Sequence, residues 1–216
     1  YATARIDESA PQRVSESVRE ALKEDSFRAL VTALMEENTR NPGTYSANPA
    51  NHKKSTASKA DAVLLEQFLP SMNFLSRELA EEIRKEQVQI RLTRRGLVIS
   101  LRQAAFFPSG QDVIAPETYG AIGKVAETIA KLPNHVRLEG HTDSMPIHNG
   151  RFRSNWHLST ARAISMLDLL TGEFRVPGAT FSVSVYSDST PVDSNDIDEG
   201  RRTNLRVDIV VLYLYG

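Results

Sequence analysis

The 216-residue sequence contains no cysteine, which excludes disulfide bonds, thiolate nucleophiles and cysteine-ligated metals. No segment approaches the ~20 consecutive apolar residues that a membrane-spanning helix needs. Charge of one sign is not in excess either, because 26 lysines and arginines nearly balance 27 acidic residues for a net charge of −1. No overall basic field is therefore available to attract nucleic acid, and we expect no nucleic-acid partner.

The first 87 residues divide into three segments. Residues 1–38 are predicted to form an N-terminal amphipathic helical segment, whose apolar residues recur at helical spacing: Val14, Val18, Leu22, Leu30, Val31, Leu34 and Met35. Residues 39–60 form a polar linker rich in proline, asparagine, serine and lysine. Helical spacing resumes over residues 61–87 as a connector, which Pro70 is expected to break or kink.

From residue 88 the apolar period changes to two, and residues 88–216 are predicted to form the main domain. Its strands are expected at 88–93, 97–102, 136–141, 180–186 and 206–213, and its helices at 116–132, 154–174 and, as a short helix, after Asn195. The strands alternate apolar and polar residues, which predicts one wet sheet face. The fold expected is a two-layer α/β sandwich, a mixed sheet with helices on one face, plus the N-terminal helical extension.

A polar constellation follows the predicted strand 136–141. Thr142 and Asp143 stand just past the strand, and Asn155, Ser159 and Arg162 share one edge of the next helix near its start, at about 100° per residue. An arginine fork suits a carboxylate and an aspartate suits an ammonium group, so this pattern indicates a site for a zwitterionic ligand. The simpler alternative is that the aspartate and the arginine pair with each other across the loop–helix junction.

A catalytic reading competes with this one. His141, Asp143 and His148 are conceivable metal ligands, and Ser159 with His157 a conceivable nucleophile and base. The sequence contains no metal-ligand spacing and no Gly-x-Ser-x-Gly elbow around them. We therefore expect neither an enzyme nor a cofactor.

Several motifs resemble the OmpA-like peptidoglycan-binding domain over about 79–214, most closely its version in MotB, the flagellar motor stator protein. The matching pieces, in family order, are Phe106-Phe107-Pro108-Ser109-Gly110, Glu139-Gly140-His141-Thr142-Asp143, Pro146-Ile147, Ser154-Asn155-Trp156, Leu158-Ser159, Arg162-Ala163, Pro191-Val192, Asn195, Glu199-Gly200-Arg201 and Asn204-Leu205-Arg206-Val207. The loop with Pro146-Ile147 and the Ser-Asn-Trp helix start resemble MotB rather than outer-membrane porins or lipoproteins.

The resemblance implies non-catalytic binding of peptidoglycan through the diaminopimelate of its stem peptide. It implies that Asp143 holds the amine and Arg162 the carboxylate. The remaining pocket residues implied in the same way are Thr142, Asn155, Leu158 and Arg206. The chain departs from the family at Leu205, where an arginine is usual, so the closing motif supplies one guanidinium fewer.

The resemblance also implies an assembly and a location. It implies a periplasmic homodimer that anchors a stator complex to the cell wall. The inner-membrane tether would precede Tyr1 and join a MotA-type subunit, and a basal-body ring protein is a further partner implied. The alternatives are an outer-membrane or lipoprotein anchor of the same family, a protein-docking module that does not bind the wall, and an enzyme that acts on the wall.

Overall fold

The computed structural model describes residues 59–213 of the chain, with side chains from residue 67 onward. The chain divides into two compact units, Tyr1–Thr56 and Ala57–Gly216, and the described residues belong to the second. The predicted amphipathic helix and nearly all of the predicted linker lie outside the described residues.

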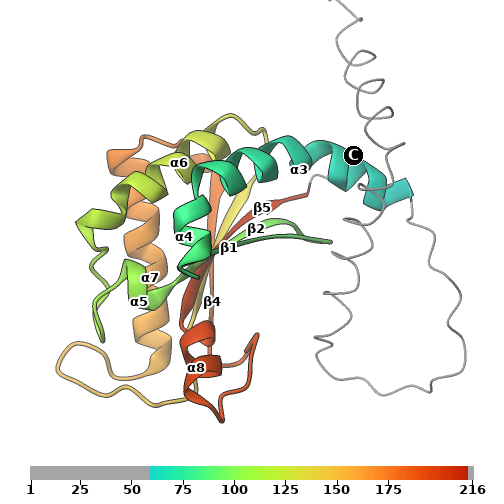
Figure 1. The fold of residues 1–216 in the computed structure, drawn as a ribbon. Coiled ribbons are helices and arrows are strands. Elements are labelled where there is room, and N and C mark those ends of the chain that lie inside the picture. Colours follow the sequence, from blue (N-terminus) through green and yellow to red (C-terminus); the bar gives the residue numbers. More distant parts are fainter. Residues whose placement is uncertain (1–58, 214–216) are drawn as a thin grey trace, which may run out of the picture. The chain divides into compact units, whose positions relative to one another are not determined.

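A five-stranded mixed sheet forms the centre of the described unit (Figure 1). Its strands are β1 Val88–Thr93, β2 Gly96–Arg102, β3 Val136–His141, β4 Phe181–Ser187 and β5 Arg206–Leu212. They lie in the order β1-β2-β5-β3-β4, in which β3 and β4 are parallel and every other neighbouring pair is antiparallel. The predicted mixed sheet is confirmed, because it contains both parallel and antiparallel neighbours. Its one parallel pair, β3 and β4, is joined by a helical crossover, as parallel strands require.

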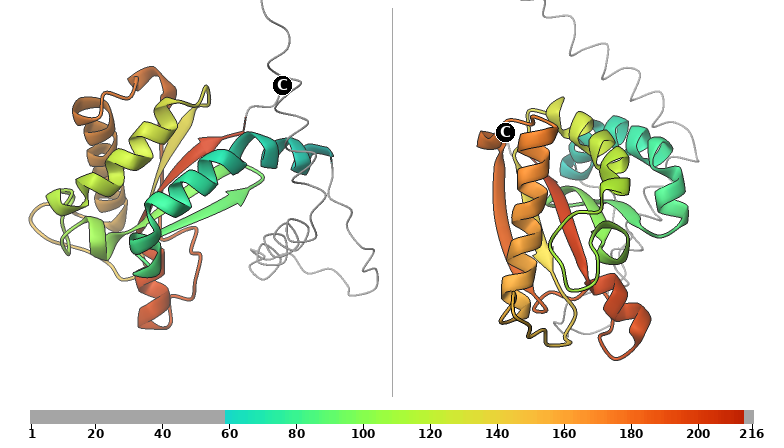
Figure 2. Two further views of the ribbon diagram at one scale, coloured as in Figure 1. Left: turned by 45° about the horizontal axis from the view of Figure 1, so that its top comes forward. Right: turned by 90° about the vertical axis from the view of Figure 1, so that its left-hand side faces the viewer.

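The helices α3, α6 and α7 lie against one face of this sheet, and α8 lies beyond one end of it (Figures 1 and 2). The α-helices are α3 Lys59–Glu78, α4 Ala80–Arg84, α5 Gln103–Phe106, α6 Tyr119–Ala130, α7 Asn155–Asp168 and α8 Asp198–Asn204. Three short turns complete the set: η1 Pro116–Thr118 before α6, the π-helical η2 Leu169–Glu173 after α7, and η3 Gly178–Thr180 before β4. This arrangement is the predicted two-layer α/β sandwich.

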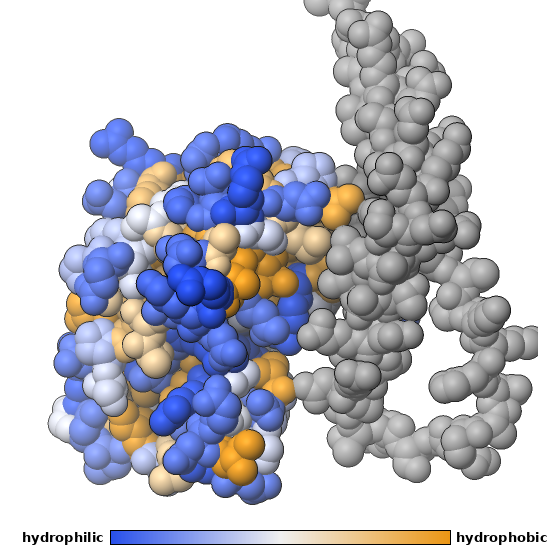
Figure 3. Space-filling view, in the orientation of Figure 1, coloured by the Kyte–Doolittle hydropathy of each residue, from blue (hydrophilic) through white to orange (hydrophobic). Residues whose placement is uncertain are grey.

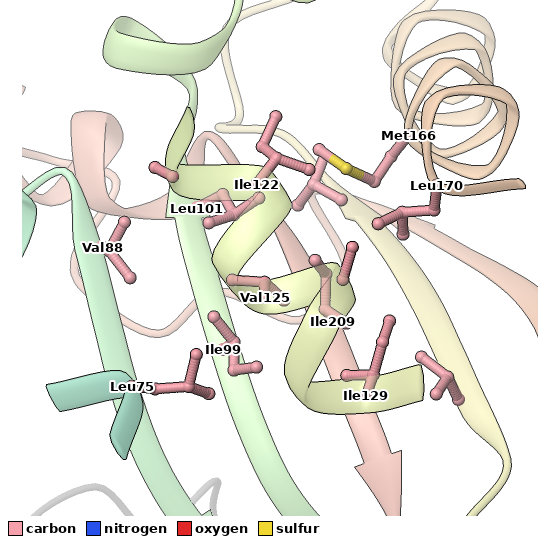
Figure 4. Close-up of a cluster of buried hydrophobic side chains, with 14 of the residues drawn as sticks. Leu75, Val88, Ile99, Leu101, Ile122, Val125, Ile129, Met166, Leu170 and Ile209 are labelled. Carbon is pink, nitrogen blue, oxygen red and sulfur yellow. The ribbon is translucent and has the colours of Figure 1, made fainter. Parts of the chain in front are cut away.

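One hydrophobic core lies between the helices and the sheet. Figure 4 shows side chains from the helices and the strands meeting there, among them Leu75 of α3, Ile99 of β2, Ile122 of α6, Met166 of α7 and Ile209 of β5. Burying such side chains stabilises a fold by ~1.5–3 kcal/mol each. The surface face in Figure 3 is by contrast mainly hydrophilic, with small hydrophobic patches.

The other face of the sheet is polar, as predicted, but at its centre it is not wet. Ser100, Glu139, His141 and Asp208 are all buried there. Arg95, in the β1–β2 turn, reaches across the sheet to Glu139, so arginine stems contribute to covering this face. The expectation of a solvated face is therefore wrong for the central strands.

Two helix boundaries also differ from expectation. The helix is not broken at Pro70, which lies inside α3; the interruption comes at Leu79, and α4 then ends at Arg84 rather than near Gln87. Phe68 and Met72 on either side of the proline are packed into the core, which holds the helix across it. The last two residues of the predicted linker belong to α3.

Candidate ligand-binding site

Strand β3 brings Thr142 and Asp143 to the start of α7 through a close contact at Gly140. A Cβ atom at Gly140 would lie 2.2 Å from the Ser159 carbonyl oxygen, so only glycine lets β3 approach α7 this closely. The Thr142 N–H then donates to the Ser187 carbonyl at 2.8 Å, which ties the strand end to β4. The backbone before Asp143 is therefore fixed on both sides.

Asn155, in the first turn of α7, holds the loop that follows Asp143. Its amide nitrogen donates to the carbonyls of Asp143 at 3.1 Å and Met145 at 2.9 Å. Its side-chain oxygen accepts the Ile147 N–H at 3.0 Å. All three bonds go to backbone, so within the described residues Asn155 acts by shaping the loop around Asp143.

Arg162 lies two turns further along α7 and is 1% exposed. Its Nε donates to the Gln111 carbonyl at 2.8 Å, and its guanidinium lies 5.4 Å from the centre of the Phe107 ring. Both terminal nitrogens are buried and have no hydrogen-bond partner among the described residues. A buried guanidinium with two unused donors is costly for the fold, which makes it the most unusual group in this region.

Asp143 and Arg162 are not among the ion pairs within 4.0 Å found in residues 59–213, so the structure does not support direct pairing. Burial lowers the pKa of Arg162 to about 10, against the opposing charges of Asp112 and Asp143. Burial likewise raises the pKa of Asp143, against the Met145 N–H and the charges of Arg201 and Arg162. The site therefore holds two opposite, partly desolvated charges that are near each other but not in contact.

The other predicted site residues fall into two places. Thr142 and Leu158 are buried beside these groups on the loop and on α7, and the Thr142 hydroxyl has no partner within the described part of the chain. Arg206 begins β5 on the opposite sheet face from α7, because it alternates with the core residue Val207. Its nitrogens donate to Asp208, and to the carbonyls of Asn204 and Thr190, so the structure does not bring it to Arg162.

Sequence reasoning missed the contribution of the loop before α6. Asp112, next to the carbonyl that binds Arg162, was not predicted at all, because no local motif marks it. Asn195 accepts the Ser144 N–H at 3.2 Å, and Arg201 donates to the Asn195 carbonyl at 2.6 Å. Both belong to a motif that the sequence does display. Arg202, in contrast, is exposed.

The serine and histidines near the site are engaged elsewhere. The Ser159 hydroxyl donates to the Asn155 carbonyl at 2.8 Å within α7. Nδ1 of His157 accepts the Arg153 N–H at 3.3 Å, and Nδ1 of His148 lies 3.3 Å from the Arg153 carbonyl. Ser159 and His157, two residues apart on a helix, do not face each other as a nucleophile and base would.

A separate cluster has the residue types of a metal site. Nε2 of His141 lies 3.7 Å from Glu139 and 3.5 Å from Asp208, on the second sheet face. These are not the predicted partners Asp143 and His148. Arginines already occupy the carboxylates: Arg95 at 2.8 Å and Arg137 at 2.7 Å on Glu139, and Arg206 at 3.1 Å on Asp208. With three guanidinium groups on two carboxylates, the cluster is an ion-pair network that favours no further cation.

Comparisons with known proteins give the family of the chain. Residues 106–205 match the OmpA family. The chain is 35% identical to motility protein B of Bacillus subtilis, over 59% of this chain and 49% of that protein, so it spans about half of that relative. It is 30% identical to the uncharacterised protein YtxE of the same organism, over 86% of this chain and 75% of that protein.

Solved structures show the same fold. The cell wall anchor of the T6SS from Pseudomonas aeruginosa is 33% identical with a TM-score of 0.59, over 65% of this chain and 97% of that one. The periplasmic domain of Helicobacter pylori MotB is 27% identical with a TM-score of 0.55, over 59% and 83% respectively. The chain therefore belongs to the OmpA family, and its relatives within that family include the MotB proteins.

Proposed function

We propose that this chain binds peptidoglycan without catalysis, through the diaminopimelate of the stem peptide. The observation that carries the proposal is the Arg162 guanidinium, which is buried and keeps two donors without a partner among the described residues. A ligand carboxylate would accept both donors, and Asp143 would accept from the ligand amine. Each of the two charges then gains the partner that the protein itself does not provide.

The shape of the site supports a small polar ligand rather than a reaction. The Asp143 backbone is held by Asn155, and Arg162 is fixed through Gln111 and Phe107, so both groups are positioned before binding. The Ser159 hydroxyl is used within its own helix. An activated nucleophile or base is not formed by these residues, which favours a binding site over an active site.

The biological role proposed is the anchoring of a flagellar stator complex to the cell wall. The support is the similarity to motility protein B and to the periplasmic domain of H. pylori MotB. On this proposal the chain is periplasmic, dimeric and tethered to the inner membrane, where it joins a MotA-type subunit. Within the described residues, no helix is both long and apolar enough to cross a membrane.

The test is cosedimentation of the full chain with purified, diaminopimelate-containing sacculi. Asp143→Ala and Arg162→Ala should each weaken binding by about 1.5–3 kcal/mol, as for hydrogen bonds to charged groups. Exposed residues of the same types provide matched controls, Asp168→Ala on α7 and Arg202→Ala on α8, and both should bind like the unmodified chain. Arg162→Lys keeps the charge without the fork, and should bind less than the unmodified chain but more than Arg162→Ala.

Two outcomes would contradict the proposal. If both site variants, shown to be folded by circular dichroism, cosediment as well as the controls, the wall is not bound at this site. Release of soluble muropeptides during prolonged incubation would identify an enzyme instead.

A further inference from the structure

The loop between α5 and α6 places a second carboxylate near the Arg162 guanidinium. Asp112 is 8% exposed, and its Oδ2 accepts from the Arg151 guanidinium at 2.7 Å. Its Oδ1 is also buried and has no hydrogen-bond partner within residues 67–213. An ionised oxygen that is buried without a hydrogen-bond donor costs free energy. Like the terminal nitrogens of Arg162, this oxygen needs a partner that the described residues do not supply.

Asp112 and Arg162 are close without being paired. The carbonyl of Gln111, the residue before Asp112, accepts from Nε of Arg162 at 2.8 Å. Among the charges that raise the pKa of Arg162, Asp112 acts more strongly than Asp143. Yet the ion pairs within 4.0 Å among the described side chains include Asp112 with Arg151 and not with Arg162. Arg162 therefore has two unused donor nitrogens, and Asp112, near them, has one unused acceptor oxygen.

Arg151 keeps that acceptor in place. Its guanidinium lies 5.6 Å from the ring centre of the neighbouring Phe152, whose side chain is buried. Asn149 accepts the N–H groups of Arg151 at 2.9 Å and Phe152 at 2.7 Å, which shapes this part of the loop. With Oδ2 fixed by Arg151, Asp112 has little freedom to rotate its other oxygen toward solvent.

Few chemical groups of a ligand can give hydrogen-bond partners to both Arg162 and Asp112. An ionised carboxylate only accepts, so it would satisfy Arg162 but would bring a second negative charge near Asp112. A primary carboxamide both accepts and donates, so its oxygen can take an arginine N–H while its nitrogen donates to the aspartate. The carboxamide also adds no charge.

We propose that Asp112 is a specificity residue, which makes the pocket prefer a stem peptide whose diaminopimelate carboxyl at Arg162 is amidated. This inference rests on the proposed function and names the form of its ligand. Asp143 keeps its role toward the ligand amine, which both forms of the peptide carry. The free acid remains a ligand, with lower affinity.

The experiment compares two synthetic stem tripeptides that end in meso-diaminopimelate, one as the free acid and one as the monocarboxamide. Isothermal titration calorimetry gives the dissociation constant of each for the full chain. We expect the carboxamide to bind about tenfold more tightly, the order of one charge-assisted hydrogen bond. Asp112→Asn removes the negative charge at nearly the same volume, and should shift the affinity ratio about tenfold toward the free acid.

The ratio of the two affinities is the decisive readout. Any loosening of the loop in Asp112→Asn lowers both affinities and leaves the ratio unchanged, so a purely structural role for Asp112 gives no shift. Asp168→Asn, an exposed carboxylate on α7, is the control and should keep the ratio of the unmodified chain.

Three results would overturn the inference. They are equal affinities of the unmodified chain for the two peptides, a preference for the free acid, or a ratio that Asp112→Asn leaves unchanged. Each leaves the proposed function standing, because both peptides still bind. Binding of neither peptide would instead overturn the proposed function, and this inference with it.

Discussion

Two buried arginines on opposite sides of the sheet differ in one respect. Arg162 on α7 is 1% exposed, and its terminal nitrogens have no partner among the described residues. Arg206 on β5 is 5% exposed, and it donates to Asp208, Asn204 and Thr190. The two side chains have the same charge and nearly the same burial. They differ in whether the described residues supply hydrogen-bond partners for their terminal nitrogens.

On the proposed function, this difference separates a structural role for Arg206 from a binding role for Arg162. Ion pairs and hydrogen bonds offset much of the desolvation cost of a buried charge. A buried charge without partners leaves that cost uncompensated and destabilises the folded state. The network around Arg206 has no need of a ligand. On the proposed function, the Arg162 guanidinium gains hydrogen bonds when a ligand carboxyl group accepts from it, and its fixed position makes the site pre-organised.

The largest expected effect is therefore on stability, and it belongs to Arg206. Arg206→Ala removes the partner of the buried Asp208 and should lower the free energy of unfolding by about 3–5 kcal/mol. Arg162→Ala should lower it by clearly less, because no carboxylate lies within 4.0 Å of that guanidinium among the described residues. Urea denaturation followed by circular dichroism measures both. Equal losses would remove the distinction between the two arginines.

A smaller, pH-dependent effect belongs to Glu139 in the same network. Burial would raise its pKa, but the adjacent His141 ring, whose Nε2 lies 3.7 Å away, together with the charge and hydrogen bonds of Arg95 and the hydrogen bond of Arg137, lowers it to about 2 from 4.5. Because the folded-state pKa is depressed, the stabilisation is present above pH 4.5 and is lost as the pH falls toward 2. The unmodified chain and Glu139→Gln should therefore differ most near neutrality and converge in acid.

Urea denaturation at a series of pH values tests this directly. A stability difference that stayed constant from pH 7 to pH 2.5 would mean that the Glu139 charge does not hold the network together. The same series on Asp168→Asn gives the background change, since that carboxylate is exposed.

Most of the fold could be predicted from the sequence, because alternation and helical spacing are local signals. Strand β3 was predicted with its observed bounds, Val136–His141. The burial of the polar face was not predictable. In the sequence of each single strand, Ser100, Glu139 and Asp208 occupy positions that are typical of solvent-exposed residues. Only their neighbours across the sheet, and Arg95 from a distant turn, show that these side chains are covered.

The site was predictable where its residues lie on one loop and one helix, and not beyond. The angle along α7 predicted that Asn155 and Arg162 share one edge of the helix, and in the structure Asn155 donates to the Asp143 carbonyl at 3.1 Å. The same reasoning could not find Asp112, whose place beside Arg162 comes from a loop 50 residues earlier in the chain. Nor could it show that Arg206 is already satisfied, because its partners depend on the tertiary fold.

The smallest effect expected concerns how Asp143 is positioned. Asn155→Ala removes three bonds to the loop backbone at Asp143, Met145 and Ile147, and touches neither charge of the site. Binding to sacculi should weaken by about 1 kcal/mol, less than for Arg162→Ala, because the groups remain but the loop is less ordered. Asn149→Ala loosens the far part of the same loop and is the matched comparison. If Asn149→Ala weakened binding more than Asn155→Ala does, the part of the loop that contacts Asp112 would limit affinity, and not the part that contains Asp143.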